Sequence, residues 1–303
     1  MAHVMHSERL MRISTALAMV SAAVLVLIKG FVYFDSKSVA MLSSLADSTI
    51  DLLASAVTLF AVRYALTPAD ADHRFGHGKA EPLSGLAQAA FVGGSAILVM
   101  IEAVSRFHEP VPVSNTTPGI IVMLISMGVT LGLVAFQRYV IKRTGSVAIS
   151  ADSLHYTGDL LMNVSVIAAL LLSSTFGLTW IDPVFGIAIS LFMFVNALRI
   201  IRQSIDSLMD HELPESDRTQ ILAIARQHPK VKQVHDLRTR SSGPKKFIQM
   251  HIVLSSALTL RDAHCVADDI EKAVESAFPG ADIIIHEDPE EVLEYQVEKI
   301  GAP

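Results

Sequence analysis

The chain has 303 residues, of which 51% are hydrophobic and 18% are charged, and its formal net charge is −6. This composition is too apolar and too poor in charge for an ordinary soluble domain. The charge is also uneven. Residues 1–204 carry 12 acidic and 13 basic side chains, a net of +1, and residues 205–303 carry 18 acidic and 11 basic ones, a net of −7. The acidic second region argues against a nucleic-acid partner and favours cations.

Apolar runs of about 20 residues recur in the first two thirds of the chain, and each is long enough to cross about 30 Å of hydrocarbon. The first run is longer than the apolar part of a usual signal peptide, and no clear A-x-A cleavage site follows it, so we count it as a span. We expect six transmembrane helices in a lipid bilayer, at residues 13–34, 39–64, 80–107, 118–140, 147–174 and 181–202.

Basic residues in the short loops predict the orientation of these helices, because positively charged loops stay in the cytoplasm. One side of the predicted membrane has only Lys37 and Arg106, with Lys29 near the end of the first span. The basic residues on the other side are Arg9, Arg12, Arg63, Arg74, Lys79, Arg138, Lys142, Arg143, Arg199 and Arg202. Both termini are therefore predicted to be cytoplasmic. The single Cys265 fits a reducing compartment.

The region after the last span is polar and has no run long enough to cross a membrane. We divide the chain into a transmembrane domain (1–204), a cytoplasmic domain (205–290) and an acidic, frayed end (291–303). Periodicity and turn residues predict a small α+β domain in the order α-β-β-α-β, like a ferredoxin-like fold that lacks its first strand. The expected helices and strands are 214–228, 231–239, 247–254, 259–278 and 282–286.

Four ionisable residues lie inside two of the apolar runs. Asp47 and Asp51 are four apart in the second span, and His155 and Asp159 are four apart in the fifth, so each pair shares one face of a helix. The two spans are expected to run antiparallel, which puts all four residues near mid-depth. Charged groups in this position cost about 2.5–3.5 kcal/mol each and usually mark function. Three carboxylates and one imidazole form a ligand set suited to zinc.

The alternative interpretation of these four residues is a polar network that only fixes helix packing, but three carboxylates without a cation would repel one another. Bound metal competes with protons for the same atoms, so protonation of His155 would expel the ion. The set therefore favours exchange of protons for metal. Asp152, at the inner end of the fifth span, is a further candidate ligand, but its lower depth favours a helix cap or an entrance charge.

A second group of ligand types lies in the loop after the second span. Asp70, His73 and His77 form the pattern D-x2-H-x3-H, and Asp72 is an alternative carboxylate. Carboxylate and imidazole in a short glycine-containing loop suit zinc. By spacing alone, a solvated polar loop is an equally good interpretation.

A third group lies in the cytoplasmic domain. The predicted strands and the second helix carry four histidines, which the hairpin and the last strand can bring to one edge. Asp288 can then bridge two metal ions, each completed by two imidazoles, as a binuclear site. Ordinary surface histidines are the alternative. The residues of this predicted site are His235, His251, His264, His286 and Asp288.

The chain resembles the cation diffusion facilitator family, including its bacterial zinc and ferrous-iron exporters. The resemblance runs from the first span to about Pro289 and rests on long segments. They are SLADSTIDLLAS, PADADHRFGHGKAEPLSGLAQ, ADSLHYTGDLLMN, VHDLRTRSSGPKKFIQMHI and FPGADIIIHEDP. The resemblance implies that the deep group is the transport site, that the loop group is a second zinc site and that the cytoplasmic group is binuclear. It also implies a homodimer in the bacterial inner membrane, with a salt bridge between Lys79 and Asp210.

The function predicted from these features is a proton-coupled antiporter that exports divalent metal. An O3N ligand set can accept zinc, ferrous iron, cadmium or manganese, and zinc is the best match. The alternatives are a membrane-bound metal sensor and a passive metal channel. An intramembrane metalloenzyme is disfavoured because no H-E-x-x-H pattern occurs and four protein ligands leave no open position on the metal.

Overall fold

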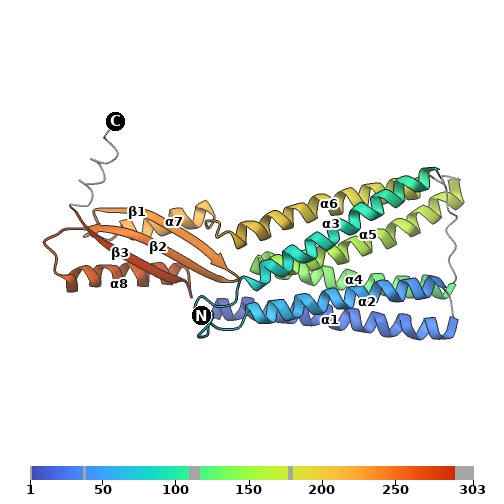
Figure 1. Ribbon diagram of the computed structural model, residues 1–303, viewed down its shortest axis with the longest axis horizontal. Helices are drawn as coiled ribbons and strands as arrows, with labels where there is room; N and C mark the ends of the chain where they lie inside the picture. Colours follow the sequence, from blue (N-terminus) through green and yellow to red (C-terminus); the bar gives the residue numbers. More distant parts are fainter. Residues whose placement is uncertain (1, 37–38, 109–116, 177–179, 291–303) are drawn as a thin grey trace. The chain divides into compact units, whose positions relative to one another are not determined.

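The structure is a computed structural model that describes residues 2–36, 39–108, 117–176 and 180–290 (Figure 1). The chain divides into two compact units. One is Ser7–Leu208, and the other is Met209–Pro303 together with Met1–His6. The predicted frayed end, 291–303, lies outside the described residues.

In the described residues the first unit has six long helices, one at the position of each predicted span. Several continue beyond the apolar run as polar turns; for example, the last helix ends at Leu208, six residues after the predicted end. The helices are α1 (Ala2–Ser36), α2 (Val39–Ala65), α3 (Ala80–His108), α4 (Thr117–Thr144), α5 (Val147–Phe176) and α6 (Ile181–Leu208).

Within the described residues, five of these helices are long and apolar enough to cross a membrane. The helix outside this group is α5, the one that carries Asp152, His155 and Asp159. The outward-facing side chains fit a lipid environment, since large apolar residues such as Leu27 and Phe31 are 72% and 78% exposed.

Small residues line the contact between α3 and α6. A side chain at Gly93 would meet Ala197 at 3.5 Å, and one at Gly186 would meet Ala103 at 2.9 Å. Such residues let helix backbones approach closely. Close packing of this kind favours association of helices in a membrane, where the hydrophobic effect does not drive it. This close contact fixes α6 against α3.

The second unit is an α+β domain in the predicted order of elements. Its members are α7 (Glu215–Arg226), β1 (Gln233–Ser242), β2 (Lys245–Leu254), α8 (Leu260–Ala277) and β3 (Asp282–Pro289). The sheet has the order β1-β2-β3, with β1 antiparallel and β3 parallel to the central β2. The β1–β2 turn places Gly243 at φ +58°, a conformation that glycine adopts without strain.

Alternation along the strands gives the sheet two different faces. Ile248, Met250 and Ile252 of β2 point into a core that also contains Ile221 of α7 and Ile270 of α8. Side chains one position along, including His251, point to the opposite face. The helices therefore cover one face, and the histidines lie on the other.

We predict that Ile270→Ala destabilises the second unit by about 2–5 kcal/mol, because Ile270 is 2% exposed and the truncation leaves a cavity in its core. Hydrogen exchange of α8 and the strands in the full-length protein measures this change. The matched control is Leu260→Ala in the same helix, which is 85% exposed and is expected to change stability by less than about 0.5 kcal/mol. Equal protection in both variants would contradict the assigned core.

Candidate metal centres

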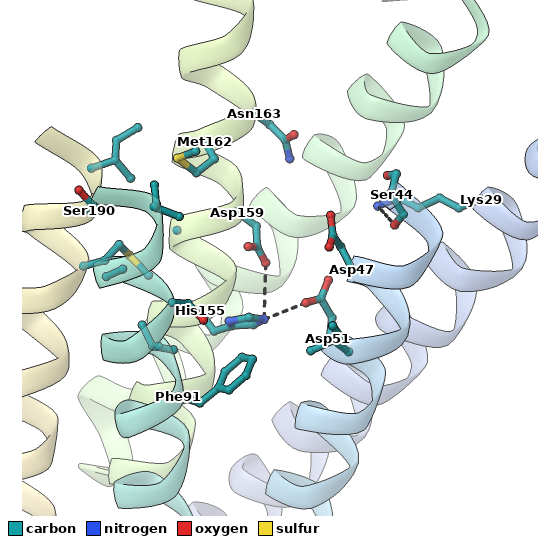
Figure 2. Close-up of a pocket in the computed structure, with 18 residues that line it drawn as sticks. Lys29, Ser44, Asp47, Asp51, Phe91, His155, Asp159, Met162, Asn163 and Ser190 are labelled. Carbon is teal, nitrogen blue, oxygen red and sulfur yellow. Dashed lines mark hydrogen bonds and ion pairs between the residues drawn. The ribbon is translucent and has the colours of Figure 1, made fainter. Parts of the chain in front are cut away.

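The deep group forms where α2 and α5 meet. His155 Nε2 lies 2.8 Å from Asp51 Oδ1 and 3.8 Å from Asp159 Oδ2, as Figure 2 shows. Ser55, one turn after Asp51 in α2, lies 3.5 Å from Asp152, one turn before His155 in α5. Later residues of α2 thus meet earlier residues of α5, so the two helices are antiparallel, as the sequence predicts.

Asp47 lines the same pocket and points towards it from α2 (Figure 2). The ligand atoms of Asp51, His155 and Asp159 lie within 4.8 Å of one another, whereas Asp47 is outside this tight group. The pocket is completed by Lys29 of α1 and by side chains of α3 and α6. The structure therefore brings three of the four predicted ligands together and places the fourth beside them.

The loop between α2 and α3 brings Asp70, His73 and His77 together, with their ligand atoms within 4.8 Å of one another. His73 Nδ1 and His77 Nε2 each lie 3.4 Å from a different oxygen of Asp70. The backbone N–H of His73 also donates to Asp70 and lowers the pKa of its carboxyl, which keeps it ionised. Asp72, the alternative carboxylate, is not part of this group; its backbone N–H donates to Asp70.

Strand register builds the cytoplasmic group. His235 of β1, His251 of β2 and His286 of β3 are directly aligned across the sheet. Asp288 lies two residues after His286, on the same face, and is 8% exposed. Its Oδ2 lies 3.2 Å from His235 Nε2 and 2.8 Å from His251 Nδ1, and its Oδ1 lies 3.4 Å from His286 Nε2. The histidines meet across the face of the sheet rather than at the predicted edge, because β3 continues past His286 to Pro289.

The fifth residue predicted for this group is placed differently. His264 is 70% exposed on α8, and its Nε2 lies 3.7 Å from Asp268, one turn along the same helix. His264 is outside the tight group formed by His235, His251 and Asp288, and so is His286, although His286 contacts Asp288. Helix periodicity could not show which way the side chain of His264 turns relative to the sheet.

Each of the three groups contains a buried side-chain atom that makes no hydrogen bond among the described residues, although two of these atoms lie within ion-pair distance of another member of their group. These atoms are Asp159 Oδ2, His77 Nδ1 and His235 Nε2. Buried polar atoms normally have partners, so an exception calls for an explanation such as a bound ion. Carboxylate oxygen and imidazole nitrogen are both ligands of zinc, and the donor sets therefore fit metal at all three positions.

The two predicted salt-bridge residues fall in different units. Lys79 Nζ donates to the carbonyl oxygens of Ser207 and Leu208 at the end of α6, at 3.0 and 2.9 Å. Asp210 accepts a hydrogen bond from Arg240 at 3.3 Å. The pairing of Lys79 with Asp210 stays a prediction.

Asp152 is neither a cap nor an entrance charge, and that prediction is wrong. Its side chain is 1% exposed and accepts from Gln88 Nε2 at 3.1 Å and from Gln137 Nε2 at 2.6 Å. Ser55, its third partner, is also 2.7 Å from the hydroxyl of Tyr156. The carboxylate therefore links α2, α3, α4 and α5 one turn from the deep group.

Sequence reasoning missed the partners of this network and the place of Lys29 in the pocket. The available signal was the presence of polar residues, Gln88 and Gln137, in otherwise apolar runs. Such residues are costly in a membrane unless they face one another or a functional site. Which helix faces they occupy depends on packing, which the linear pattern does not contain.

A model of the cation efflux transmembrane domain matches residues 15–209, and a model of the cytoplasmic domain of cation efflux proteins matches residues 213–290. The chain is 43% identical over 285 residues to the cation-efflux pump FieF of Yersinia enterocolitica, with 94% of this chain and 95% of that protein covered. It is 44% identical over 284 residues to FieF of Pectobacterium atrosepticum, with 94% of each covered.

Two solved structures that are similar to this chain each cover about a quarter of it. One is the zinc transporter CzrB in its zinc form, at 35% identity, with 27% of this chain and 93% of that chain covered and a TM-score of 0.26. Another is the metal-bound C-terminal domain of the CzcD transporter from Thermotoga maritima, at 27% identity, with 25% and 94% covered and a TM-score of 0.24.

We predict that Asp152→Ala lowers the free energy of unfolding by about 2–5 kcal/mol, because the amides of Gln88 and Gln137 lose a buried acceptor. Denaturant titration in detergent measures the change. Glu102→Ala is the control, since Glu102 is an exposed membrane-helix carboxylate whose loss is expected to cost less than about 0.5 kcal/mol. Equal stability of the two variants would show that Asp152 does not hold the helices together.

Proposed function

Because the chain belongs to the cation efflux family, whose members are secondary transporters rather than enzymes, we propose that it exports a divalent metal ion from the cytoplasm in exchange for protons. The observation that carries this proposal is the meeting of Asp51, His155 and Asp159 in a pocket between two antiparallel helices, with Asp47 beside them. These four residues are proposed to bind the transported ion.

The ligand chemistry supports zinc as the substrate. Three carboxylates and one imidazole offer four donors for a tetrahedral ion. The oxygen-rich set is harder than a thiolate set, so ferrous iron and cadmium are further substrates in this proposal. His155 lies 2.8 Å from Asp51, so a proton on its ring occupies the space between two metal ligands. Protons that arrive from the outer side therefore displace the metal, and the metal displaces protons on the cytoplasmic side.

The other two groups are proposed as sites of zinc that stays bound. The cytoplasmic group lies on the sheet face opposite the helices, where Asp288 contacts three histidines. Zinc bound there is proposed to strengthen a homodimer of the cytoplasmic domain, which is ferredoxin-like with α-β-β-α-β order. The loop group is proposed as a second zinc site, and Lys79 and Asp210 are proposed to form a salt bridge.

The proposed location is the bacterial inner membrane, with six spans and both termini in the cytoplasm. In this arrangement α5 is the fifth span, and its three ionisable residues are tolerated because they face the protein interior. The proposed domains are a transmembrane domain to residue 204 and a metal-binding cytoplasmic domain to residue 290.

Two other functions make different use of the same residues. A membrane-bound sensor would read zinc with the cytoplasmic group and would gain nothing from carboxylates deep in the membrane. A passive channel would let metal cross with no return of protons, so its flux would persist with no pH gradient. The deep carboxylates therefore favour transport over sensing, and the response of the metal flux to a pH gradient separates an antiporter from a channel.

We predict that Asp51→Asn lowers the initial rate of zinc uptake into proteoliposomes at least about tenfold, because a neutral amide replaces an anionic ligand of a divalent ion. The matched control is Asp35→Asn, which changes an exposed carboxylate of α1 outside the pocket. It is expected to transport at the normal rate. Undiminished transport by Asp51→Asn would rule out the proposed transport site.

We predict that Asp288→Ala removes zinc from the cytoplasmic domain and weakens dimerisation, while Asp269→Ala, an exposed carboxylate on α8, changes neither. The physical reason is the loss of the one carboxylate that contacts all three aligned histidines. Zinc content per chain and sedimentation of the full-length protein in detergent are the two measurements. Normal values of both in Asp288→Ala would contradict the stabilising role.

A further inference from the structure

A fixed cation lies in the wall of the deep pocket. Lys29, on α1, lines the same pocket as the four proposed metal ligands (Figure 2). Its Nζ donates to Ser48 Oγ at 2.7 Å and to the carbonyl oxygen of Ser44 at 3.3 Å. Both acceptors are neutral atoms of α2, so these two hydrogen bonds hold the ammonium in place without cancelling its charge.

The nearby charges act on this ammonium from two helices. Asp51 and Asp47 of α2 and Asp159 of α5 are its electrostatic neighbours. Ser44 and Ser48 flank Asp47 in the sequence, so their hydrogen bonds keep Lys29 next to the outer half of the site in the proposed orientation. On the α5 side, Asn163 lies one turn beyond Asp159 and lines the same pocket. A metal ion that leaves outward therefore passes close to a positive charge.

We propose that Lys29 sets the metal affinity of the transport site: its ammonium, anchored by Ser44 and Ser48, weakens the binding of a divalent cation and thereby speeds its release. This inference rests on the proposed function of the deep site. Three carboxylates around one divalent ion would form a site with a net negative charge, which binds tightly and releases slowly. The positive charge of Lys29 brings the net charge of the three carboxylates and the divalent ion to zero, and Lys29 does not occupy a ligand position.

Lys29 is thus a positioning and affinity-setting residue rather than a metal ligand. A purely structural role would make it a tie between α1 and α2, and loss of that tie would lower stability without tightening metal binding. If Lys29 instead lowers the metal affinity, removal of its charge tightens metal binding. Coulomb repulsion between a single and a double charge in a partly buried site is large enough to change affinity roughly tenfold or more.

The test uses Lys29→Gln, which removes the charge but keeps a donor for Ser48, and Lys29→Arg, which keeps the charge. Zinc transport is measured in proteoliposomes over a range of zinc concentrations, and zinc binding is measured by calorimetry on the full-length protein in detergent. For Lys29→Gln we expect a KM and a Kd for the deep site that are each lower by roughly tenfold, together with a slower maximal rate. Lys29→Arg is expected to keep both constants within about twofold of the original protein.

Two controls separate the possible failures. In calorimetry, the heat that disappears in Asp51→Asn is the heat of zinc binding to the deep site. Normal zinc binding and transport in that variant would contradict the proposed function itself. Ser48→Ala removes one anchor but no charge, and it reports the effect of a looser tie between α1 and α2. If Asp51→Asn loses binding while Lys29→Gln binds zinc with unchanged or lower affinity, the inference about Lys29 is wrong. The same holds if Lys29→Arg and Lys29→Gln behave alike.

Discussion

The contact between Asp51 and His155 is the interaction on which the proposed transport site depends. It joins α2 to α5 at 2.8 Å, and the antiparallel direction of these helices brings Ser55 to Asp152 one turn away. Ionisable side chains in a membrane are tolerated only when they face one another or a polar cavity. We infer that α2 and α5 turn their Asp and His faces inward for this reason, and apolar faces such as that of Leu27 and Phe31 on α1 are left for lipid.

The polar network around Asp152 extends this constraint to two more helices. Gln88 of α3 and Gln137 of α4 both donate to the same buried carboxylate, one turn from the proposed metal ligands. A movement of α5 that alters the deep group must also alter these hydrogen bonds. The close approach of Gly93 to Ala197 keeps α3 together with α6, so helices on both sides of the pocket are tied to the ligand-bearing pair.

Periodicity made much of the chain predictable. Spacing of four residues put Asp47 with Asp51 and His155 with Asp159, and the predicted hairpin and last strand put four histidines and Asp288 in one group, of which His235, His251 and His286 are aligned by strand register. These patterns depend only on helix and strand geometry. Periodicity does not predict how the faces of different elements meet. Three features depend on that packing: the network of Asp152, the exposed position of His264 on α8 and the position of Lys29 in the pocket. The sequence pattern predicted Asp51, His155 and Asp159, which lie together in the structure, but it did not predict the polar groups that surround them.

The central claim is that one deep site exchanges metal for protons, and simultaneous measurement of the two fluxes tests it most directly. Proteoliposomes that contain a zinc indicator and a pH indicator are given zinc with and without an imposed pH gradient. The account predicts that zinc entry is accompanied by proton exit. It also predicts that a lumen more acidic than the outside solution accelerates both fluxes. Zinc entry at an unchanged rate, with no movement of protons in either condition, would contradict it.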